Sequence, residues 1–443
     1  MLIIGNGRLL TRDERNTYHE NGAVCCDGGV IVEIGKTAAL KQMYPEAEFL
    51  DAGGGVIMPG LINAHSHIYS ALSRGLSIKG YNPVNFYEVL DGMWWAIDRR
   101  LTLAGTRCSA SQTYIDSIKN GVTTLYDHHA GYGAIEGSLF EIADVARAMH
   151  YRTCLCYEVS DRDGKEKRDA AIRENAEFIK HAKAQNSDMI KAMFGLHAAF
   201  TLSDETLELC FKHKPADIGF HIHVAEGMND VYDSLDRYAK RTVNRLHDMG
   251  ILGKRTIAGH CIHLSPGEME LLKATDTMVV NNPESNMGNA VGCSPVLQLM
   301  DRQILVGLGT DAYTHDMLES LKVALLIQRH NAMMPNVGWR EVMQMLFYNN
   351  AKIGARAFTT PLGVLAPGAA ADIAVFDYKP FTPFGADNAD GHILFGFSGK
   401  GCVHTVIDGK IAMKDRTILC CDEEEINAKT LETAKKLWGS LNG

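Results

Sequence analysis

The fold of this chain is decided by the stretch MPGLINAHSH at residues 58–67. The apolar run from Val56 to Ile62 predicts a buried strand, and two histidines one residue apart follow it. Side chains at positions i and i+2 of an extended strand point to the same side, so His65 and His67 can reach one point beyond the strand end. Two imidazoles that converge on one point are a metal-ligand arrangement.

Length and composition exclude several classes of protein. The chain has 443 residues, enough for a barrel of about 250 residues and a second domain. A formal net charge of -9 argues against nucleic-acid binding, which needs a basic face. No polybasic run suggests a membrane surface, and no apolar run approaches the roughly 18 residues of a membrane-spanning helix. The first residues, MLIIGNG, lack the charged start of a signal peptide, so we expect a cytoplasmic protein.

The 11 cysteines form no CxxC pair. A thiolate zinc site or a dithiol redox motif is therefore not expected. In a reducing cytosol such cysteines are buried small hydrophobic residues.

Between residues 56 and 310, eight β-like runs alternate with segments of helical period, a pattern typical of a parallel (β/α)8 barrel. The long segment from Tyr69 to Gly121 exceeds one connection and predicts extra helices over the barrel mouth. The eight runs are Val56–Ala64, Val122–Asp127, Thr153–Glu158, Ile190–Leu196, Ile218–Val224, Thr256–His260, Thr277–Asn281 and Ile304–Gly309.

The two ends of the chain resemble each other in composition. Residues 1–57 contain short β-like runs separated by glycine, and residues 361–420 return to that pattern, with a further run predicted at Gly391–Phe397. Neither half has enough strands to bury its own face, so both should form one small discontinuous β-sandwich domain. The predicted organisation is this α/β fold, with the TIM-like barrel at 58–360 and a C-terminal helix at 421–443.

Polar residues gather where the predicted barrel strands end, which is where such barrels place active sites. Three imidazoles and a carboxylate suit zinc or ferrous iron and leave a position for water. A carboxylate three residues after a strand-end histidine can lie beside a metal without binding it. The residues are His65, His67, His197, His221, His223, Glu226, His260, His263 and Asp311.

Six sequence motifs together resemble those of one known protein family. The chain is similar to the amidohydrolase superfamily, in the deaminase branch that includes guanine deaminase, cytosine deaminase-like enzymes and triazine hydrolases, and within it to the SsnA aminohydrolases. The motifs are PGLINAHSH at 59–67, FGLHAAFT at 194–201, HIHVAE at 221–226, GHCIHL at 259–264, NPESNM at 282–287 and GLGTD at 307–311.

The resemblance implies roles for individual residues. Glu226 matches the proton shuttle, His260 the histidine that polarises the attacking water, and His197 a substrate contact. Asp311 also takes a proton from that water. The metal ligands implied by the match are His65, His67, His223 and Asp311.

Two departures from the family pattern bear on the substrate. Ala199 stands where the family usually has proline, and Asn281 stands where histidine often precedes NPxSN. Binuclear relatives carry a modified lysine at the end of strand four, whereas here Lys191 lies too early. We therefore expect one divalent metal per chain, zinc first and iron second.

Several sequence features allow two interpretations. Trp94 and Trp95 either bind a flat ring or pack inserted helices. His221 fits a hydrogen-bonded core residue better than a ligand, and the segment Asp127-His128-His129 fits either a position behind the ligands or a capped loop.

The predicted function is metal-dependent hydrolytic deamination of an amino-substituted N-heterocycle, such as a purine, pyrimidine or triazine, with release of ammonia. Hydrolysis of another leaving group, chloride or an alkylamine, is the nearest alternative. A noncatalytic binding protein on the same fold is the remote one, because such proteins usually lose ligands. The expected partner is a small heterocycle, with neither nucleic acid nor membrane, and a homodimer is the oligomer we expect.

Overall fold

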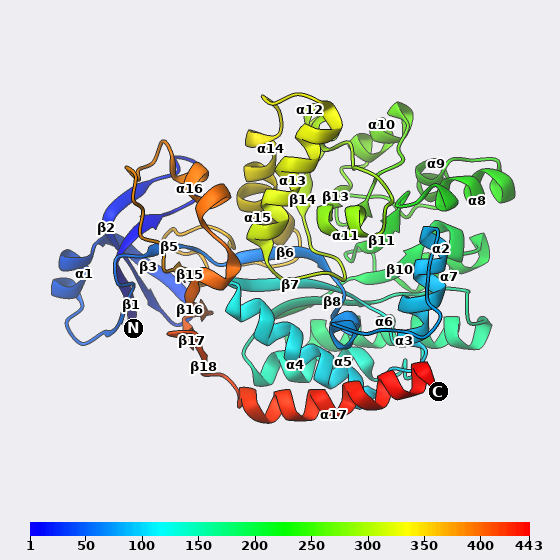
Figure 1. Cartoon of the computed structure of the whole chain (residues 1–443), viewed down its shortest axis with the longest axis horizontal. Coiled ribbons are helices and arrows are strands. Elements are labelled where there is room, and N and C mark those ends of the chain that lie inside the picture. The colour runs from blue at the N-terminus through cyan, green and yellow to red at the C-terminus, as the bar shows by residue number, and fades with distance from the viewer.

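The computed structural model describes residues 1–443 and contains two β structures side by side, a parallel barrel and a sheet built from both ends of the chain (Figure 1). The barrel strands fall into two parallel sheets, β6-β7-β8-β9 and β10-β11-β12-β13-β14. Their bounds are β6 Leu61–Ser66, β7 Val122–His129, β8 Arg152–Tyr157, β9 Ile190–Ala192, β10 Phe194–Ala198, β11 Phe220–Val224, β12 Ile257–His260, β13 Met278–Asn281 and β14 Val306–Leu308.

Two parallel bridges connect these sheets into a closed barrel. Ser66 pairs with Asp311 where β14 meets β6, and Val159 pairs with Leu196 beside β8 and β10. The (β/α)8 barrel is therefore confirmed. Its fourth predicted strand, Ile190–Leu196, is divided into β9 and β10.

Helices cover the outside of the barrel, and two of them begin at a serine cap. Ser203 accepts a hydrogen bond from the Thr206 N–H at the start of α7, and Ser265 forms a capping box with Glu268 at the start of α10. The helices are α4 Leu103–Lys119, α5 Ser138–Ala148, α6 Lys165–Gln185, α7 Asp204–His213, α8 Met228–Tyr238, α9 Thr242–Asp248, α10 Pro266–Ala274, α11 Pro283–Gly288, α12 Val296–Asp301, α13 Met317–Ala332, α14 Trp339–Gln344 and α15 Asn350–Gly354.

The second sheet has nine strands and joins the two ends of the chain. Its order is β18-β17-β16-β15-β5-β1-β2-β3, with β4 paired to β1, and α1 (Thr37–Met43) packs against it. The strands are β1 Leu2–Leu10, β2 Tyr18–Asp27, β3 Val30–Lys36, β4 Glu48–Asp51, β5 Val56–Pro59, β15 Ile373–Phe376, β16 Cys402–Ile407, β17 Lys410–Lys414 and β18 Thr417–Ile418.

Both ends of the chain contribute to one hydrophobic core inside this sheet. Leu9 and Val24 come from the first 59 residues, and Ile373 and Val406 come from the C-terminal strands. Strand β5 forms the junction, because it pairs with β1 on one side and antiparallel with β15 on the other. Neither end of the chain completes this core alone.

The apolar run Val56–Ala64, predicted as one barrel strand, is two strands in two different sheets. Strand β5 belongs to the terminal sheet and β6 to the barrel, with Gly60 between them. A Cβ atom at Gly60 would lie 2.2 Å from the hydroxyl oxygen of Thr123, so only glycine allows the chain to cross between the sheets here.

The predicted strand at Gly391–Phe397 is wrong, because this segment lies in helix α16 (Ala389–Gly396). Ala389 and Ile393 are buried four residues apart on one helical face. A short apolar run cannot be assigned to strand or helix by periodicity alone.

A further group of helices covers the barrel mouth, as the long segment after the first strand predicts. It contains α2 (Phe86–Val89), a π-helical turn over Leu90–Trp94 and α3 (Trp95–Asp98). The last helix, α17 (Glu423–Asn442), runs along α4 and reaches this group (Figure 1).

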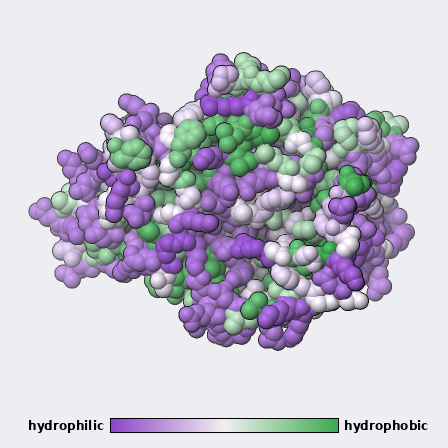
Figure 2. Space-filling model, in the orientation of Figure 1, coloured by the Kyte–Doolittle hydropathy of each residue, from purple (hydrophilic) through white to green (hydrophobic).

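Hydrophilic side chains cover most of the face drawn in Figure 2, with hydrophobic residues gathered in smaller groups. None of the helices combines the length and the apolar character that crossing a bilayer requires.

Candidate active site

The first and last strands of the barrel bring the first ligand candidates together. Nε2 of His67 lies 2.7 Å from Oδ1 of Asp311, and Nε2 of His65 lies 3.3 Å from the same oxygen. The backbone N–H groups of Thr310 and Asp311 both donate to the carbonyl oxygen of His65, at 3.0 Å each. The carboxylate of Asp311 therefore faces both histidines of the HxH pair.

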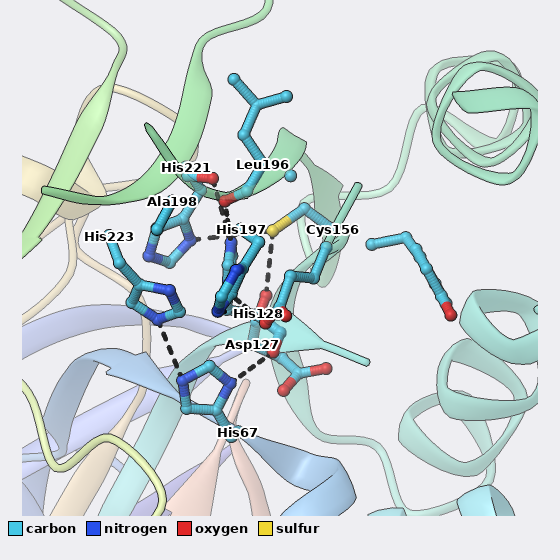
Figure 3. A network of polar contacts seen from close by, with 12 residues as sticks. His67, Asp127, His128, Cys156, Leu196, His197, Ala198, His221 and His223 are labelled. Atoms are coloured by element: carbon cyan, nitrogen blue, oxygen red, sulfur yellow. Dashed lines mark hydrogen bonds and ion pairs between the residues drawn. The ribbon is translucent and has the colours of Figure 1, made fainter. Parts of the chain in front are cut away.

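Two further histidines close this cluster. One ligating atom from each of His65, His223, His260 and Asp311 lies within 4.8 Å of the others, and all four residues are buried. Nε2 of His223 is 3.2 Å from Nε2 of His67 (Figure 3). Histidines from three strands and a carboxylate thus face one point.

The cluster fits a divalent metal. Nε2 of His65 is buried and has no hydrogen-bond partner, although it points at the cluster. Burial lowers the pKa of His65 to about 3 and that of His223 well below its usual range, so both rings are neutral and keep a lone pair for a metal.

The other two ligand candidates, His67 and Asp311, shift each other's pKa. Burial alone would lower the pKa of His67, but the Asp311 carboxylate raises it to about 9. Burial alone would raise the pKa of Asp311, but the imidazoles of His67 and His65 hold it well below its usual range. Since ligands bind a metal in their deprotonated form, a proton and a metal compete for His67.

Buried groups behind the ligands fix the orientation of their rings. Nδ1 of His65 lies 2.7 Å from Nε2 of His221, and Nδ1 of His67 lies 2.6 Å from the carbonyl oxygen of His128. The His128 ring in turn lies 3.0 Å from the carbonyl oxygens of Leu196 and His221 (Figure 3). Such partners of metal-ligating histidines select the tautomer and aim the ring.

The NPESNM motif forms helix α11 and supports the other side of the cluster. Asn286 Oδ1 lies 2.7 Å from Nδ1 of His260, and the Ser285 hydroxyl donates a hydrogen bond to Asp311. Asn282 lies near Nε2 of His260 as well, at 3.5 Å. The motif was evident in the sequence, but its contacts with His260 and Asp311 were not.

Glu226 lies beside the cluster rather than within it. Its Oε2 atom is 3.5 Å from Nε2 of His260, and its carboxylate is absent from the groups of side chains that converge on one point. Burial, together with the nearby Asp311 carboxylate, raises the pKa of Glu226 to about 7 even though His260 lowers it. A carboxyl group with such a pKa can accept and release a proton near neutral pH.

The backbone is strained at the strand ends that carry these groups. Four non-glycine residues adopt the left-handed region, Ala225 at φ 47°, His260 at φ 66°, Cys261 at φ 50° and Asp311 at φ 56°. Such conformations cost about 1–3 kcal/mol each and persist where the surrounding structure imposes them.

A cavity of about 30 Å³ adjoins the cluster, with room for roughly one water molecule. His67, His223, Glu226 and Asp311 form its floor. Phe86, Leu90, Trp94, Trp95 and His197 form much of the rest, so the structure places the three predicted substrate contacts at this cavity. Residues of the mouth helices thus line the cavity beside the cluster.

The sequence interpretation missed Glu158, which follows β8 and lines the same cavity. Its carboxylate lies 3.4 Å from Nδ1 of His128 and 3.7 Å from Nε2 of His197. Burial alone would raise the pKa of Glu158, but His197, His128 and Arg162 hold it well below its usual range. Its position at the end of the third barrel strand was the signal that could have identified it.

The remaining candidates are not among the side chains that converge on one point. Asp127 accepts a hydrogen bond from the Ile68 N–H, and His129 is fully buried, with its pKa lowered to about 3 by burial. His263 lies near the Val291 carbonyl oxygen, at 2.8 Å. Lys191 lines a different cavity with Arg255 and forms an ion pair with Asp188.

Comparison with known proteins agrees with this geometry. Residues 56–412 match the model of the amidohydrolase family, and residues 22–47 match a bacterial imidazolonepropionase-like composite domain. A 5'-deoxyadenosine deaminase of Methanosarcina mazei is 30% identical over 449 residues, covering 100% of this chain and 99% of that protein.

Solved structures share the fold over nearly the whole chain. A zinc-bound adenosine deaminase from Xanthomonas campestris superposes with a TM-score of 0.85 at 20% identity, covering 99% of this chain and 98% of its own. The atrazine chlorohydrolase TrzN from Arthrobacter aurescens, complexed with zinc, gives a TM-score of 0.82 at 21% identity, covering 98% of this chain and 100% of its own.

Proposed function

The chain belongs to the amidohydrolase family and is a hydrolase of carbon–nitrogen bonds other than peptide bonds, and from this premise we propose how its residues deaminate an amino-substituted N-heterocycle. The observation that carries the proposal is the arrangement of His65, His67, His223 and Asp311. His65, His223 and Asp311 converge with His260 on one point, and His67 adjoins them, with Nε2 2.7 Å from Asp311 and 3.2 Å from His223. We infer from this arrangement that these four residues, His65, His67, His223 and Asp311, are the ligands, with Glu226 beside them. A noncatalytic protein would have no need for all of these groups at one cavity.

We assign the metal to these four ligands, one ion per chain, with zinc as the first candidate and iron as the second. Imidazole and carboxylate donors suit both ions. A divalent cation in such a site lowers the pKa of bound water to about 7 and so supplies a nucleophile at neutral pH.

The protein groups would move the protons of the reaction. Asp311 accepts a proton from the attacking water, and Glu226 delivers a proton to the ring nitrogen next to the attacked carbon. His260, 3.5 Å from Glu226, donates a hydrogen bond to the oxygen of the tetrahedral carbon. Asp311 would then pass the proton that it accepted to the amino group, and Glu226 would recover a proton from the attacking oxygen. The carbon–nitrogen bond breaks, ammonia leaves, and the oxygen remains as the oxo group of the product.

Substrate position would be set by the aromatic residues over the cavity. Trp94 and Trp95 can stack on a flat ring. His197 can accept a hydrogen bond from that ring through Nε2, because its Nδ1 lies 2.6 Å from the Thr201 hydroxyl, which itself donates to the Ala198 carbonyl oxygen. The named relative acts on 5'-deoxyadenosine, so an adenosine-like purine is the first substrate to test.

The test is release of ammonia by purified, metal-loaded protein across purines, pyrimidines, pterins and triazines. We expect turnover with one of these classes and none with His223→Ala, which removes a ligand. Release of chloride or an alkylamine from a substituted triazine, without ammonia release from any amino heterocycle, would support the alternative leaving group and contradict deamination.

The proposal includes a cytoplasmic location, which suits the free thiol state of all 11 cysteines. It also includes a homodimer, which size-exclusion chromatography with light scattering would test. Its expected ligand is a small heterocycle, with no nucleic acid.

A further inference from the structure

We propose that Glu158 is a specificity-determining residue whose carboxylate accepts a hydrogen bond from an N–H group on the six-membered ring of the substrate. It would thereby select free amino-oxo heterocycles over adenine nucleosides. This inference rests on the proposed deaminase function and extends it to the substrate class.

Glu158 is a fixed part of the cavity wall. Its side chain is only 3% exposed, yet the residue lines the same small space as His197, His223 and Glu226. Its backbone is fixed on both sides, because its N–H donates to the His129 carbonyl oxygen and its carbonyl oxygen accepts from the Tyr132 hydroxyl. The carboxylate is therefore held at one position.

The protein leaves this carboxylate with capacity to accept hydrogen bonds. Its nearest cationic or imidazole partners, His128 Nδ1 at 3.4 Å and His197 Nε2 at 3.7 Å, are farther away than a well-formed hydrogen bond requires. A buried carboxylate is costly unless it is hydrogen-bonded. A donor on a bound ring would satisfy it, whereas a ring with only acceptors would leave it unpaired.

The position of Glu158 also identifies which part of the substrate it meets. One carboxylate oxygen of Glu158 and one ring nitrogen each of His197 and His223 lie within 4.8 Å of one another. Since His223 belongs to the cluster where the reacting carbon must lie, Glu158 contacts the ring that carries this carbon. The ribose of a nucleoside is attached to the other ring of the purine and lies farther away.

This position distinguishes two kinds of substrate. In a 2-amino-4-oxo pyrimidine ring, as in guanine or a pterin, the oxo group brings a ring N–H with it. The six-membered ring of adenine carries only acceptor nitrogens besides its amino group. Sites built to bond a substrate N–H reject analogues that lack it more strongly than apolar pockets reject a missing methylene. Glu158 thus favours a different ring from that in the name of the relative.

The experiment compares 2-aminopyrimidin-4-one with 2-aminopyrimidine, which differ in the oxo group and its ring N–H. Binding of both, and of 5'-deoxyadenosine, is measured by calorimetry on metal-loaded wild type and Glu158→Gln. We expect wild type to prefer the oxo compound, and Glu158→Gln to lose roughly 10- to 100-fold in affinity for that compound alone, the range for a hydrogen bond to a charged group.

A matched control is Glu174→Gln, which makes the same change at another buried glutamate, one that accepts from the backbone N–H groups of Gly137 and Leu139 outside the cavity. It should leave the preference unchanged. Equal affinity of the wild type for both pyrimidines, an equal loss for all three compounds in Glu158→Gln, or loss of metal from that variant would each overturn the inference. Because the measurement is binding, a protein that binds selectively but releases no ammonia would contradict the deaminase proposal and not this one.

Discussion

His67 and Asp311 lie 2.7 Å apart through Nε2 and Oδ1, although one follows the first barrel strand and the other the last. The contact exists only when the barrel is closed, because β14 must lie beside β6 to bring the two side chains together. Assembly of the candidate metal centre and closure of the barrel are therefore the same structural event.

Glu226→Gln keeps the size of the side chain but removes its ability to shuttle a proton. General acid–base groups contribute about 10² to 10⁴ in rate, so we expect turnover to fall on that scale with metal content and substrate binding near normal. His223→Ala should instead lose metal, because it removes a ligand. Metal analysis and steady-state kinetics on both variants make the comparison. Metal loss in Glu226→Gln would make Glu226 a ligand, and full turnover would give its role to His260 or Asp311.

Elemental analysis of the purified protein should give about one zinc or iron per chain. The physical reason is that Lys191, the nearest lysine before the end of the fourth strand, lies at a separate cavity and is paired with Asp188. Chelation should abolish turnover, and zinc should restore it. Two ions per chain together with a modified lysine would contradict a mononuclear centre.

A buried ion pair links the barrel to the terminal sheet. Nε of Arg152, on β8, lies 2.8 Å from Oδ2 of Asp372, just before β15, and both side chains are 2% exposed. Removing one partner of such a pair costs about 3–5 kcal/mol, so Asp372→Asn should lower the melting temperature clearly. The ion pair of Arg302 with Glu270, which lies at the surface, provides the control. Glu270→Gln should leave the melting temperature nearly unchanged.

Asp372→Asn also tests the predicted division of the chain into domains. We predict a β-sandwich domain at 1–57 and 361–420, a barrel domain at 58–360 and a C-terminal helix at 421–443. If Asp372→Asn melts in one transition with wild-type cooperativity, the barrel and the terminal sheet unfold together. A separate early transition, with release of residues 1–57 by limited proteolysis, would contradict a single joined sheet domain.

Asp230 should make stability fall as pH rises. Its carboxylate accepts from the backbone N–H groups of Phe200 and Ala225 at 3.0 and 2.8 Å, and burial raises its pKa to about 7. The folded protein therefore holds a proton that the unfolded chain has released, so this contribution is complete below about pH 4 and is lost as pH rises through about 7. Between pH 5 and 8 the melting temperature of wild type should fall more than that of Asp230→Asn. Parallel curves for the two proteins would contradict this.

The sequence predicted the parts of the fold that depend on periodicity and on strand-end chemistry. Side chains two residues apart on a strand must share a side, so His65 and His67 could be paired before any coordinates were known. The helix caps at Ser203 and Ser265 are equally local, because each serine accepts a hydrogen bond from a backbone N–H only three residues ahead. These features need only a few neighbouring residues.

Features that arise from contacts between distant segments escaped prediction. Glu158 was missed because no histidine marks the end of its strand, and only the fold places it opposite His197. Asp311 adopts its left-handed backbone where its N–H donates to the carbonyl oxygen of His65, a residue far away in the chain. The helix at Ala389–Gly396 depends on its packing, since its apolar run fits a strand equally well.

Leu437, on α17, shares a hydrophobic cluster with Trp94 and Trp95, and the nearby Trp438 donates from its indole N–H to the Leu72 carbonyl oxygen at 2.8 Å. The roof of the cavity is thus braced by a helix that leaves the ribosome after every barrel strand. A nascent chain that has already made every barrel strand carries all the candidate metal ligands, while the roof above them still lacks this helix. The protein can then bind its metal before its substrate pocket is complete, because the ligands are translated before the helix that braces the pocket.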